Sequence, residues 1–292
     1  MTILIAVFGL FHPHVLTVRQ ATASPVRIVA PMQKELRSME AMEIRTAVTL
    51  EGDFLLAVPG RIERRYQGRL AVHQQGSELV PVLEADLESA VAAVVAAEMP
   101  GSFHVEARKA QAIAARSWYV ASRKRHGDYD FCDTTHCQVF KEPASARYPE
   151  IVVRYNGEVL ATLYAASCGG STMSAAEAGM NSGEYPYFRV SCEEHAEAWV
   201  RRFHGEEAAA VRRQPHAESI RVALGRALGW DALPGNNYLL VEQGKDVLLR
   251  GKGRGHGLGL CQQGAGQMAR QGATAARIIE HYYPNTQLSG MR

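Results

Sequence analysis

The sequence predicts an α+β protein, a mixed fold in which a β-rich N-terminal region precedes a helical core. Short apolar runs separated by turn or polar residues fill the first 80 residues, which is typical of small sheets. Ala-rich segments with apolar residues at helical spacing begin near residue 84. Because strands and helices do not alternate regularly afterwards, a doubly wound sheet is not expected.

The N-terminal region contains several candidate strands. We expect them at residues 3–7, 15–18, 26–29, 46–50, 54–58, 70–73 and 79–82. The change of character near residue 84 sets the predicted domain division: a β-rich region at 1–83 and a core at 84–292.

Two helices are predicted to open the core as a helical hairpin. In residues 84–99, Leu87, Val91, Val94 and Val95 recur at helical spacing, and a Pro-Gly pair follows. Residues 105–124 form a second Ala-rich helical stretch.

The rest of the core is more irregular. Strands at 151–155 and 159–164 flank Asn156-Gly157, a favoured two-residue hairpin turn. A polar helical insertion is expected at about 195–235, strands within 239–249, a glycine-rich loop at 251–259 and a closing helix at 261–281.

Composition excludes some classes of function. The net charge of +2 over 292 residues gives no electrostatic reason to expect nucleic-acid binding. No run of 18 apolar residues exists, so no integral membrane segment is expected. The N-terminus lacks the basic residues of a signal peptide, so 3–7 is assigned as a strand, and removal of an export signal stays an alternative. Five cysteines are too few for a disulfide scaffold, and the odd number leaves at least one unpaired.

Five sequence blocks occur in a characteristic order. They are Ala-Ala-Glu-Met-Pro at 96–100, the Ala-rich helix at 107–117, Cys-Asp-Thr-Thr-His-Cys-Gln-Val at 132–139, Ala-Ser-Cys-Gly-Gly at 166–170 and Gly-His-Gly-Leu-Gly at 255–259. In this order they resemble the SpoIID/LytB family (stage II sporulation protein D and amidase enhancers). The resemblance covers roughly residues 85–175 and 251–288 and is weak over the first 80.

The resemblance implies a peptidoglycan lytic transglycosylase with a substrate cleft. Such an enzyme cuts the MurNAc–GlcNAc β-1,4 bond of glycan strands, here stripped of stem peptides, and leaves a 1,6-anhydro-MurNAc end. It further implies an extracytoplasmic location and a partner amidase that removes the peptides. No organic cofactor is expected.

Glu98 is the candidate catalytic acid. A glutamate near a helix end is most often a solvated surface residue. Here the negative end of the helix dipole and the Ala, Met and Pro neighbours would both raise its pKa, as a general acid requires. The position also matches the catalytic glutamate of the family.

Substrate-binding roles are implied for several cations and one tyrosine. Lys109 and Arg116 are seven residues apart on one helix face, which favours either two exposed cations or, by resemblance, two residues of the glycan cleft. Tyr187 and Arg189 match another block linked to substrate contact.

A zinc site is the second candidate feature. His126, Cys132, His136 and Cys137 fall within twelve residues, and two cysteines with a histidine are plausible zinc ligands. The resemblance suggests His126, Cys132 and Cys137 as ligands around an open fourth position, with His136 as a competitor. A reduced pair and a disulfide are the alternatives, and we assign Asp133-Thr134-Thr135 to turn geometry.

The two glycine-containing loops are assigned to the glycan cleft. A Cys-His nucleophile at Cys168 is possible in principle, but we prefer Ser167, Cys168 and Gly169 as a substrate-binding loop. His256 joins this set from the glycine-rich block, which lacks the Gly-Lys-Ser/Thr of a phosphate loop. Arg254 stands where the family usually has Trp, which questions sugar stacking there.

Two other functions remain as alternatives to a lytic transglycosylase. The chain could be a non-catalytic activator of a cell-wall amidase, as some LytB-type relatives are described. Alternatively, its cysteines and histidines could form a thiol or metallo-hydrolase site that cuts peptide bonds.

Overall fold

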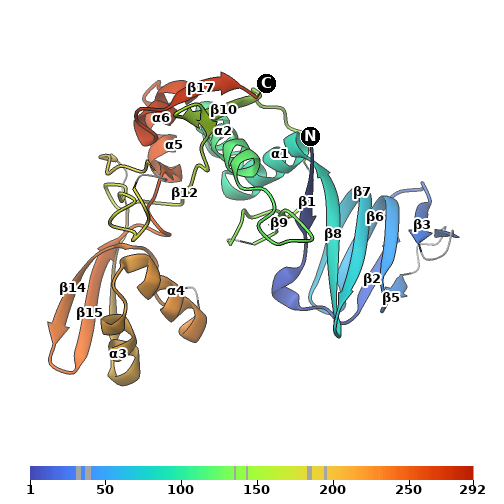
Figure 1. Ribbon diagram of the computed structural model, residues 1–292, viewed down its shortest axis with the longest axis horizontal. Helices are drawn as coiled ribbons and strands as arrows, with labels where there is room; N and C mark the ends of the chain where they lie inside the picture. Colours follow the sequence, from blue (N-terminus) through green and yellow to red (C-terminus); the bar gives the residue numbers. More distant parts are fainter. Residues whose placement is uncertain are drawn as a thin grey trace. The chain divides into compact units, whose positions relative to one another are not determined.

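The computed structural model describes residues 1–30, 34–36, 41–134, 136–142, 144–182, 186–193, 196–229 and 231–291 (Figure 1). The chain divides into two compact units. The first contains Met1–Pro100 and Tyr119–Pro149, and the second contains Gly101–Trp118 and Glu150–Arg292. Helices and several sheets occur together, which confirms the α+β prediction.

The first unit is built on one large sheet. Its strands run in the order β4-β3-β6-β7-β8-β1-β9, with β2 pairing to both β5 and β6. All pairings are antiparallel except β1 with β9. The strands are β1 Thr2–Ala6, β2 Leu16–Gln20, β3 Val26–Ala30, β4 Lys34–Leu36, β5 Met42–Ile44, β6 Val48–Val58, β7 Ile62–Gln75, β8 Glu78–Asp86 and β9 Phe131–Cys132.

The centre of this sheet is a long hairpin of β6 and β7 (Figure 1). The sequence predicted two strands where β6 runs unbroken, because Glu51, Gly52 and Asp53 interrupt the apolar pattern. In the structure Gly52 stays paired with Gly68. A Cβ at Gly52 would lie 3.3 Å from Pro25 O, so the glycine permits close packing rather than a chain reversal.

The two predicted helices of the core are present. Helix α1 spans Leu87–Glu98, and the Asp86 side chain caps it by accepting from Ser89 N at 3.1 Å. Helix α2 spans Val105–Ala121; it belongs to the second unit up to Trp118 and to the first from Tyr119. None of the helices in the described ranges is long and apolar enough to cross a bilayer.

The second unit contains three small sheets. Their orders are β11-β10-β17, β12-β16 and β13-β15-β14. Asn156 and Gly157, both at positive φ, form the predicted turn between β10 and β11. The elements are β10 Ile151–Tyr155, β11 Glu158–Val159, β12 Tyr164–Ala165, β13 Ala198–Phe203, α3 Gly205–Arg213, α4 Ala217–Leu228, β14 Asn237–Gln243, β15 Asp246–Lys252, β16 Leu260–Cys261, α5 Gln262–Arg270, α6 Ala275–Tyr282 and β17 Gln287–Gly290.

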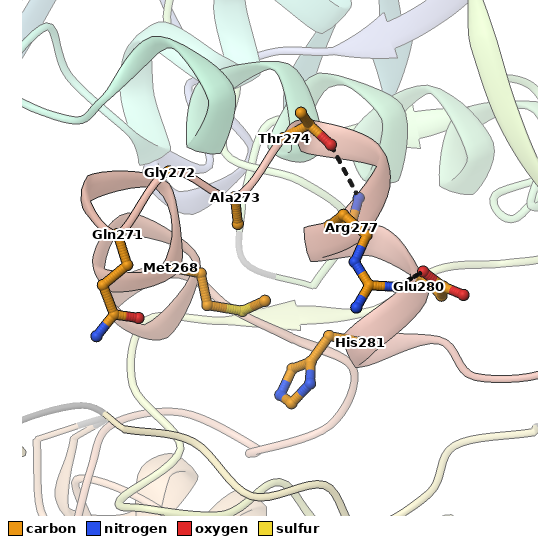
Figure 2. A pocket seen from close by; sticks show the side chains of 8 residues that line it. All are labelled: Met268, Gln271, Gly272, Ala273, Thr274, Arg277, Glu280 and His281. Carbon is orange, nitrogen blue, oxygen red and sulfur yellow. Dashed lines mark hydrogen bonds and ion pairs between the residues drawn. The ribbon is translucent and has the colours of Figure 1, made fainter.

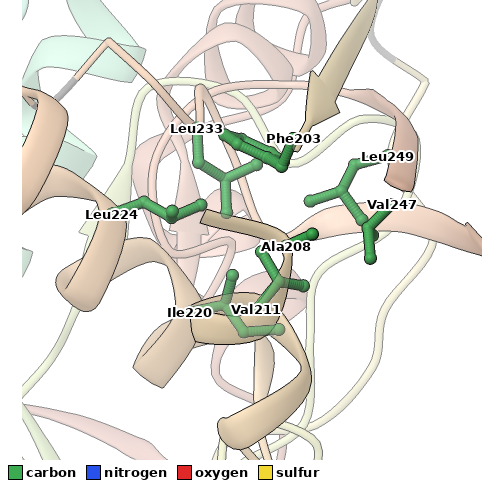
Figure 3. Packing of buried hydrophobic residues seen from close by; sticks show 8 residues of the cluster. All are labelled: Phe203, Ala208, Val211, Ile220, Leu224, Leu233, Val247 and Leu249. Atoms are coloured by element: carbon green, nitrogen blue, oxygen red, sulfur yellow. The ribbon is translucent and has the colours of Figure 1, made fainter. Parts of the chain in front are cut away.

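The segment around 195–235 is only partly helical. Strand β13 occupies its beginning, and α3 and α4 follow. Helices and sheet share one apolar core, seen in Figure 3, because the apolar residues of α3 and α4 need a partner surface and β15 supplies it. Its buried members are Phe203, Ala208, Val211, Ile220, Leu224, Leu233, Val247 and Leu249. The predicted boundary between residues 83 and 84 stays a prediction.

The expected closing helix is broken into α5 and α6. Gly272 at φ +93° ends the first, and the Thr274 side chain caps the second by accepting from Arg277 N at 3.4 Å. The strand expected at 159–164 is likewise reduced to the short β11 and β12.

Gly259 is a position where we expect a side chain to be strongly destabilising. Its φ is +65°, and an added Cβ would overlap Leu163 O, which accepts from Leu260 N and Tyr283 Oη. Gly259→Ala should lower the free energy of unfolding by about 2–4 kcal/mol, because backbone strain of about 1–3 kcal/mol adds to the displaced carbonyl. Denaturant unfolding measures the difference.

Gly272→Ala is the matched control, since Gly272 also has positive φ but an added Cβ meets nothing within 4 Å. Equal losses for the two variants would contradict the role of the Leu163 contact.

Candidate functional site

The predicted site residues fall in both units. Glu98 and the candidate metal ligands His126, Cys132 and Cys137 belong to the first unit. The candidate substrate-binding residues belong to the second: Lys109, Arg116, Ser167, Cys168, Gly169, Tyr187, Arg189 and His256.

Glu98 is the last residue of α1 and is half-buried. The next residue, Met99, is fully buried and caps the helix through its N–H bond to Val95 O at 2.8 Å. The Glu98 side chain therefore lies at the C-terminal, negative end of the α1 dipole.

Tyr119 lies close enough to Glu98 and to the cysteine-containing loop for the charges of both to affect its hydroxyl group. Its ring is buried and packs edge-on against Phe131 with centroids 4.8 Å apart. Burial raises the pKa of Tyr119, and the charges of Cys137, Cys132 and Glu98 raise it further. Tyr119 is not among the site residues predicted from the sequence, because a tyrosine near the end of an amphipathic helix is usually a core residue.

The loop after α2 is anchored to β1 by two buried aspartates. Asp130 accepts from Leu4 N at 3.0 Å, and Asp133 accepts from Phe8 N and from Arg64 Nη1, both at 2.9 Å. Burial alone would raise the pKa of Asp130, but the hydrogen bonds it accepts lower it overall. These contacts, together with β9, fix the backbone on either side of Cys132.

Four nitrogen and sulfur ligands converge in this loop. One atom each of His126, Cys132, His136 and Cys137 lies within 4.8 Å of the others. His126 Nε2 is 3.2 Å from Cys137 Sγ, and His136 Nδ1 is 3.7 Å from both sulfurs. The donor set suits Zn²⁺, which prefers four such ligands. Thr135, assigned to turn geometry, lies outside the described residues.

The two cysteines of this loop form no disulfide and share a hydrogen bond. The hydrogen bond from the Cys137 thiol, aided by Thr134 and His136, lowers the pKa of Cys132 well below that of an ordinary thiol. The resulting thiolate raises the pKa of Cys137. A thiol that ionises as readily as Cys132 offers a thiolate ligand to a cation.

Lys109 is tied to its own helix. Its Nζ lies 2.6 Å from Glu106 Oε1, while Glu106 Oε2 accepts from Ala275 N at 2.8 Å. The Lys109 side chain remains 37% exposed, so it keeps access to solvent.

Arg116 does not lie on an open helix face. It is fully buried and donates from Nη1 to Ile151 O at 3.1 Å, which links α2 to β10. The seven-residue spacing placed Lys109 and Arg116 on one face, but β10 covers the second position.

Ser167, Cys168 and Gly169 form a tightly packed loop. Ser167 exchanges two backbone hydrogen bonds with Arg254, and an added Cβ at Gly169 would lie 2.7 Å from Lys252 O. The close approach that these glycines allow is therefore to the glycine-rich loop of the protein itself. Arg254 remains exposed and lies 4.0 Å from Asp231.

His256 is held as a neutral ring. Its Nδ1 accepts from Leu258 N at 3.1 Å. Burial lowers the pKa of His256 to about 4, although the charge of Glu218 opposes this. Glu218 in turn pairs with Arg221 at 2.6 Å and accepts from Asn236 Nδ2 at 2.7 Å. This network fixes the glycine-rich loop on α4.

Tyr187 and Arg189 have different environments. Tyr187 is buried, and its hydroxyl donates to Ala161 O. Arg189 is half-exposed, pairs with Glu177 and donates to Ser171 Oγ at 2.7 Å.

We expect the Arg189–Glu177 pair to make stability depend on acid pH. The hydrogen bond from Arg189 lowers the pKa of Glu177 from its ordinary 4.5 to about 2. A carboxyl whose folded pKa is depressed stabilises the fold above its unfolded pKa and loses that contribution as pH falls from about 4.5 toward 2. Arg189→Gln should return the Glu177 pKa toward 4.5, as followed by carboxyl NMR titration. An unchanged titration would contradict the pairing.

A surface hollow lies between the end of α5 and α6 (Figure 2). None of the predicted site residues lines it. Its lining residues are Met268, Gln271, Gly272, Ala273, Thr274, Arg277, Glu280 and His281.

Comparison with known proteins finds one matching family model and several relatives of modest identity. Residues 75–162 match the sequence model of SpoIID, described as Stage II sporulation protein. Stage II sporulation protein D of Bacillus amyloliquefaciens is 27% identical over 257 residues, covering 70% of this chain and 74% of the relative. That of Bacillus subtilis is 25% identical over 254 residues, with the same coverage. An uncharacterized protein of Brachyspira hyodysenteriae is 26% identical over 261 residues, covering 75% and 70%.

The fold and site define an α+β protein in which a helix-terminal glutamate and a Cys/His ligand cluster share one unit. The matched segment contains α1, α2 and that cluster. This segment is similar to SpoIID, and the relatives named Stage II sporulation protein D are similar over 70% of the chain, which confirms the resemblance predicted from the sequence.

Proposed function

We propose that this protein is a peptidoglycan lytic transglycosylase with Glu98 as its single acid and base. It would act on peptide-stripped glycan strands, cutting the MurNAc–GlcNAc β-1,4 bond. The observation that carries the proposal is the position of Glu98, half-buried at the last residue of α1 within the SpoIID-matched segment. Relatives named for stage II of sporulation support a role at the cell wall.

The mechanism that we propose uses one carboxylate. Most glycosidases use two, one as acid and one as nucleophile or base. The nearest carboxylates in the sequence after α2 are Asp128, Asp130 and Asp133. Asp130 and Asp133 are buried and accept backbone hydrogen bonds, so we assign them to stabilising the loop. Asp128 is exposed.

With one carboxylate, Glu98 protonates the glycosidic oxygen as the bond breaks. Its carboxylate then accepts the proton of the C6 hydroxyl as that oxygen attacks the anomeric carbon. The attacking group belongs to the reacting sugar, so its effective concentration reaches roughly 10⁵ M in well-oriented cases. No second carboxylate is then needed to hold a water molecule.

Zinc at His126, Cys132, His136 and Cys137 belongs to the same proposal. Four ligands make a closed site, which is typical of structural rather than catalytic zinc. The resemblance suggested three ligands and an open position, with His136 as a competing ligand; the convergence of all four side chains leads us to propose a four-ligand site instead. The ion would hold the loop that packs against Tyr119, and Glu98 is one of the charges acting on that tyrosine.

The remaining candidate residues keep narrower roles. Lys109 and Arg189 retain exposed side chains and stay candidates for glycan contact. Arg116, Tyr187, Cys168 and His256 are better placed to support the loops around them, since each is buried or bonded within the fold. An extracytoplasmic location and an amidase that strips the glycan complete the proposal.

The proposal is tested by incubating the purified chain with peptide-free glycan strands. Release of soluble fragments supports an enzyme. If no fragments appear, and an amidase becomes faster when the chain is added, the protein is an activator instead. Release of free amines that stops with a chelator would point to a peptide-cutting metallo-hydrolase.

A further inference from the structure

Three buried cysteines of the second unit come together outside the proposed catalytic residues. Cys168 follows β12, Cys192 precedes β13 in the chain, and Cys261 ends β16. They are 2%, 8% and 1% exposed, and their sulfur atoms lie within 4.8 Å of one another. None of these three cysteines forms a disulfide within the described residues.

Backbone hydrogen bonds hold the three segments together. Strands β12 and β16 pair in parallel with Ala165 opposite Cys261. Cys192 N donates to Gly170 O at 3.0 Å, which ties the second cysteine to the loop that carries the first. The convergence of the sulfurs is thus a property of the fold and not of one side-chain rotamer.

The surroundings of the Cys261 sulfur favour negative charge on that atom. Cys261 is the N-cap of α5, and its Sγ accepts from Gly264 N at 3.3 Å and from Cys168 N at 3.4 Å. N–H groups and a helix N-terminus stabilise a thiolate. Tyr282 Oη lies 3.2 Å from Cys192 Sγ and offers a further polar group.

The absence of a side chain at Gly264 lets Cys192 and Tyr282 pack directly against the α5 backbone. An added Cβ there would overlap both Cys192 Sγ and Tyr282 Oη. A side chain at this first turn of α5 would displace the second cysteine from the other two.

Two simpler roles explain the cluster less well. A nucleophile must reach its substrate, but the three cysteines are at most 8% exposed. A disulfide would join two of the sulfurs and leave the third without a role. One ion at the centre uses all three.

We propose that Cys168, Cys192 and Cys261 bind one soft d¹⁰ metal ion, Cu(I) or Zn(II), through their three sulfurs. Thiolates without carboxylates select this class of metal. Metal–sulfur bonds of about 2.3 Å require only a small inward movement of atoms already this close. Binding replaces S–H protons, which pass to solvent, and transfers no electrons. Zn(II), which prefers four ligands, would take Tyr282 Oη or a water as the fourth. The site shares no residue with the loop cluster and does not depend on glycan cleavage.

The test uses the full chain with Cys132→Ser and Cys137→Ser, so that the loop cluster cannot contribute. The reduced protein is titrated with Cu(I) and, separately, with Zn(II) against a competing chelator. We expect about one tightly bound ion of at least one of these metals per chain. Adding Cys192→Ser should weaken binding by at least about tenfold to a hundredfold, whereas Ser191→Ala, the neighbouring control, should not.

X-ray absorption on the loaded protein without the Cys192 change gives a second readout, because it counts the sulfur neighbours of the ion directly and needs no comparison with the Cys192 variant. Three sulfur neighbours at about 2.3 Å from the metal would support the site. The energy of the X-ray absorption edge identifies the bound metal. The proposal is overturned by binding of neither metal, by fewer than three sulfur neighbours, or by a native disulfide joining two of the three cysteines.

Discussion

Glu98→Gln should abolish glycan cleavage while leaving the fold intact. The amide has nearly the same shape as the carboxyl group, but it can neither give a proton to the leaving oxygen nor accept one from the C6 hydroxyl. Loss of a general acid and base should cost on the order of a hundredfold or more in turnover. Fragment release from peptide-free glycan measures it.

Glu88→Gln is the matched control for this change. Glu88 lies in the first turn of the same helix, where its negative charge interacts favourably with the positive end of the helix dipole. We expect it to retain cleavage and to lose at most about 1 kcal/mol of stability. Wild-type turnover by Glu98→Gln, with a normal melting curve, would remove Glu98 from the mechanism.

Loss of the loop metal is the second large effect that we expect. Cys132→Ser with Cys137→Ser should remove about one zinc ion per chain, because Zn²⁺ needs both thiolates to complete four ligands. Structural zinc contributes about 10–16 kcal/mol of binding energy in small zinc-dependent domains. This loop is also held by Asp130 and Asp133, so a lower melting temperature rather than global unfolding should follow.

Metal analysis of protein purified without chelator, together with melting curves, checks this expectation. Asp128→Asn is the control, since Asp128 is exposed in the same loop and lies outside the ligand cluster. His136→Ala separates the two ligand sets: it should weaken zinc binding in a four-ligand site and have little effect in a three-ligand site. A Cys132–Cys137 disulfide in the isolated protein would contradict the metal site altogether.

Much of the fold followed from local sequence signals. Helix α1 has both its apolar spacing and its Asp86 cap within a few residues, and the Asn156-Gly157 turn needs positive φ at two adjacent positions. The unbroken β6 was missed because the pairing of Gly52 with Gly68 depends on a partner strand that the local sequence does not specify.

Part of the candidate site could likewise be predicted from local sequence, and part could not. The loop cluster was predictable because its four ligands are close in sequence. The burial of Arg116 was not, because the strand that covers it lies 35 residues further along the chain. The cluster of Cys168, Cys192 and Cys261 joins segments up to 93 residues apart, so no spacing motif could have indicated it.

The most direct measurement of the central claim is mass spectrometry of the products cut from peptide-free glycan in isotopically labelled water. Because the C6 hydroxyl attacks in place of water, each new end should carry 1,6-anhydro-MurNAc, one water molecule lighter than a hydrolysis product, and should contain no label. A reducing MurNAc end carrying the label would contradict the single-carboxylate mechanism and require a second catalytic carboxylate to activate water.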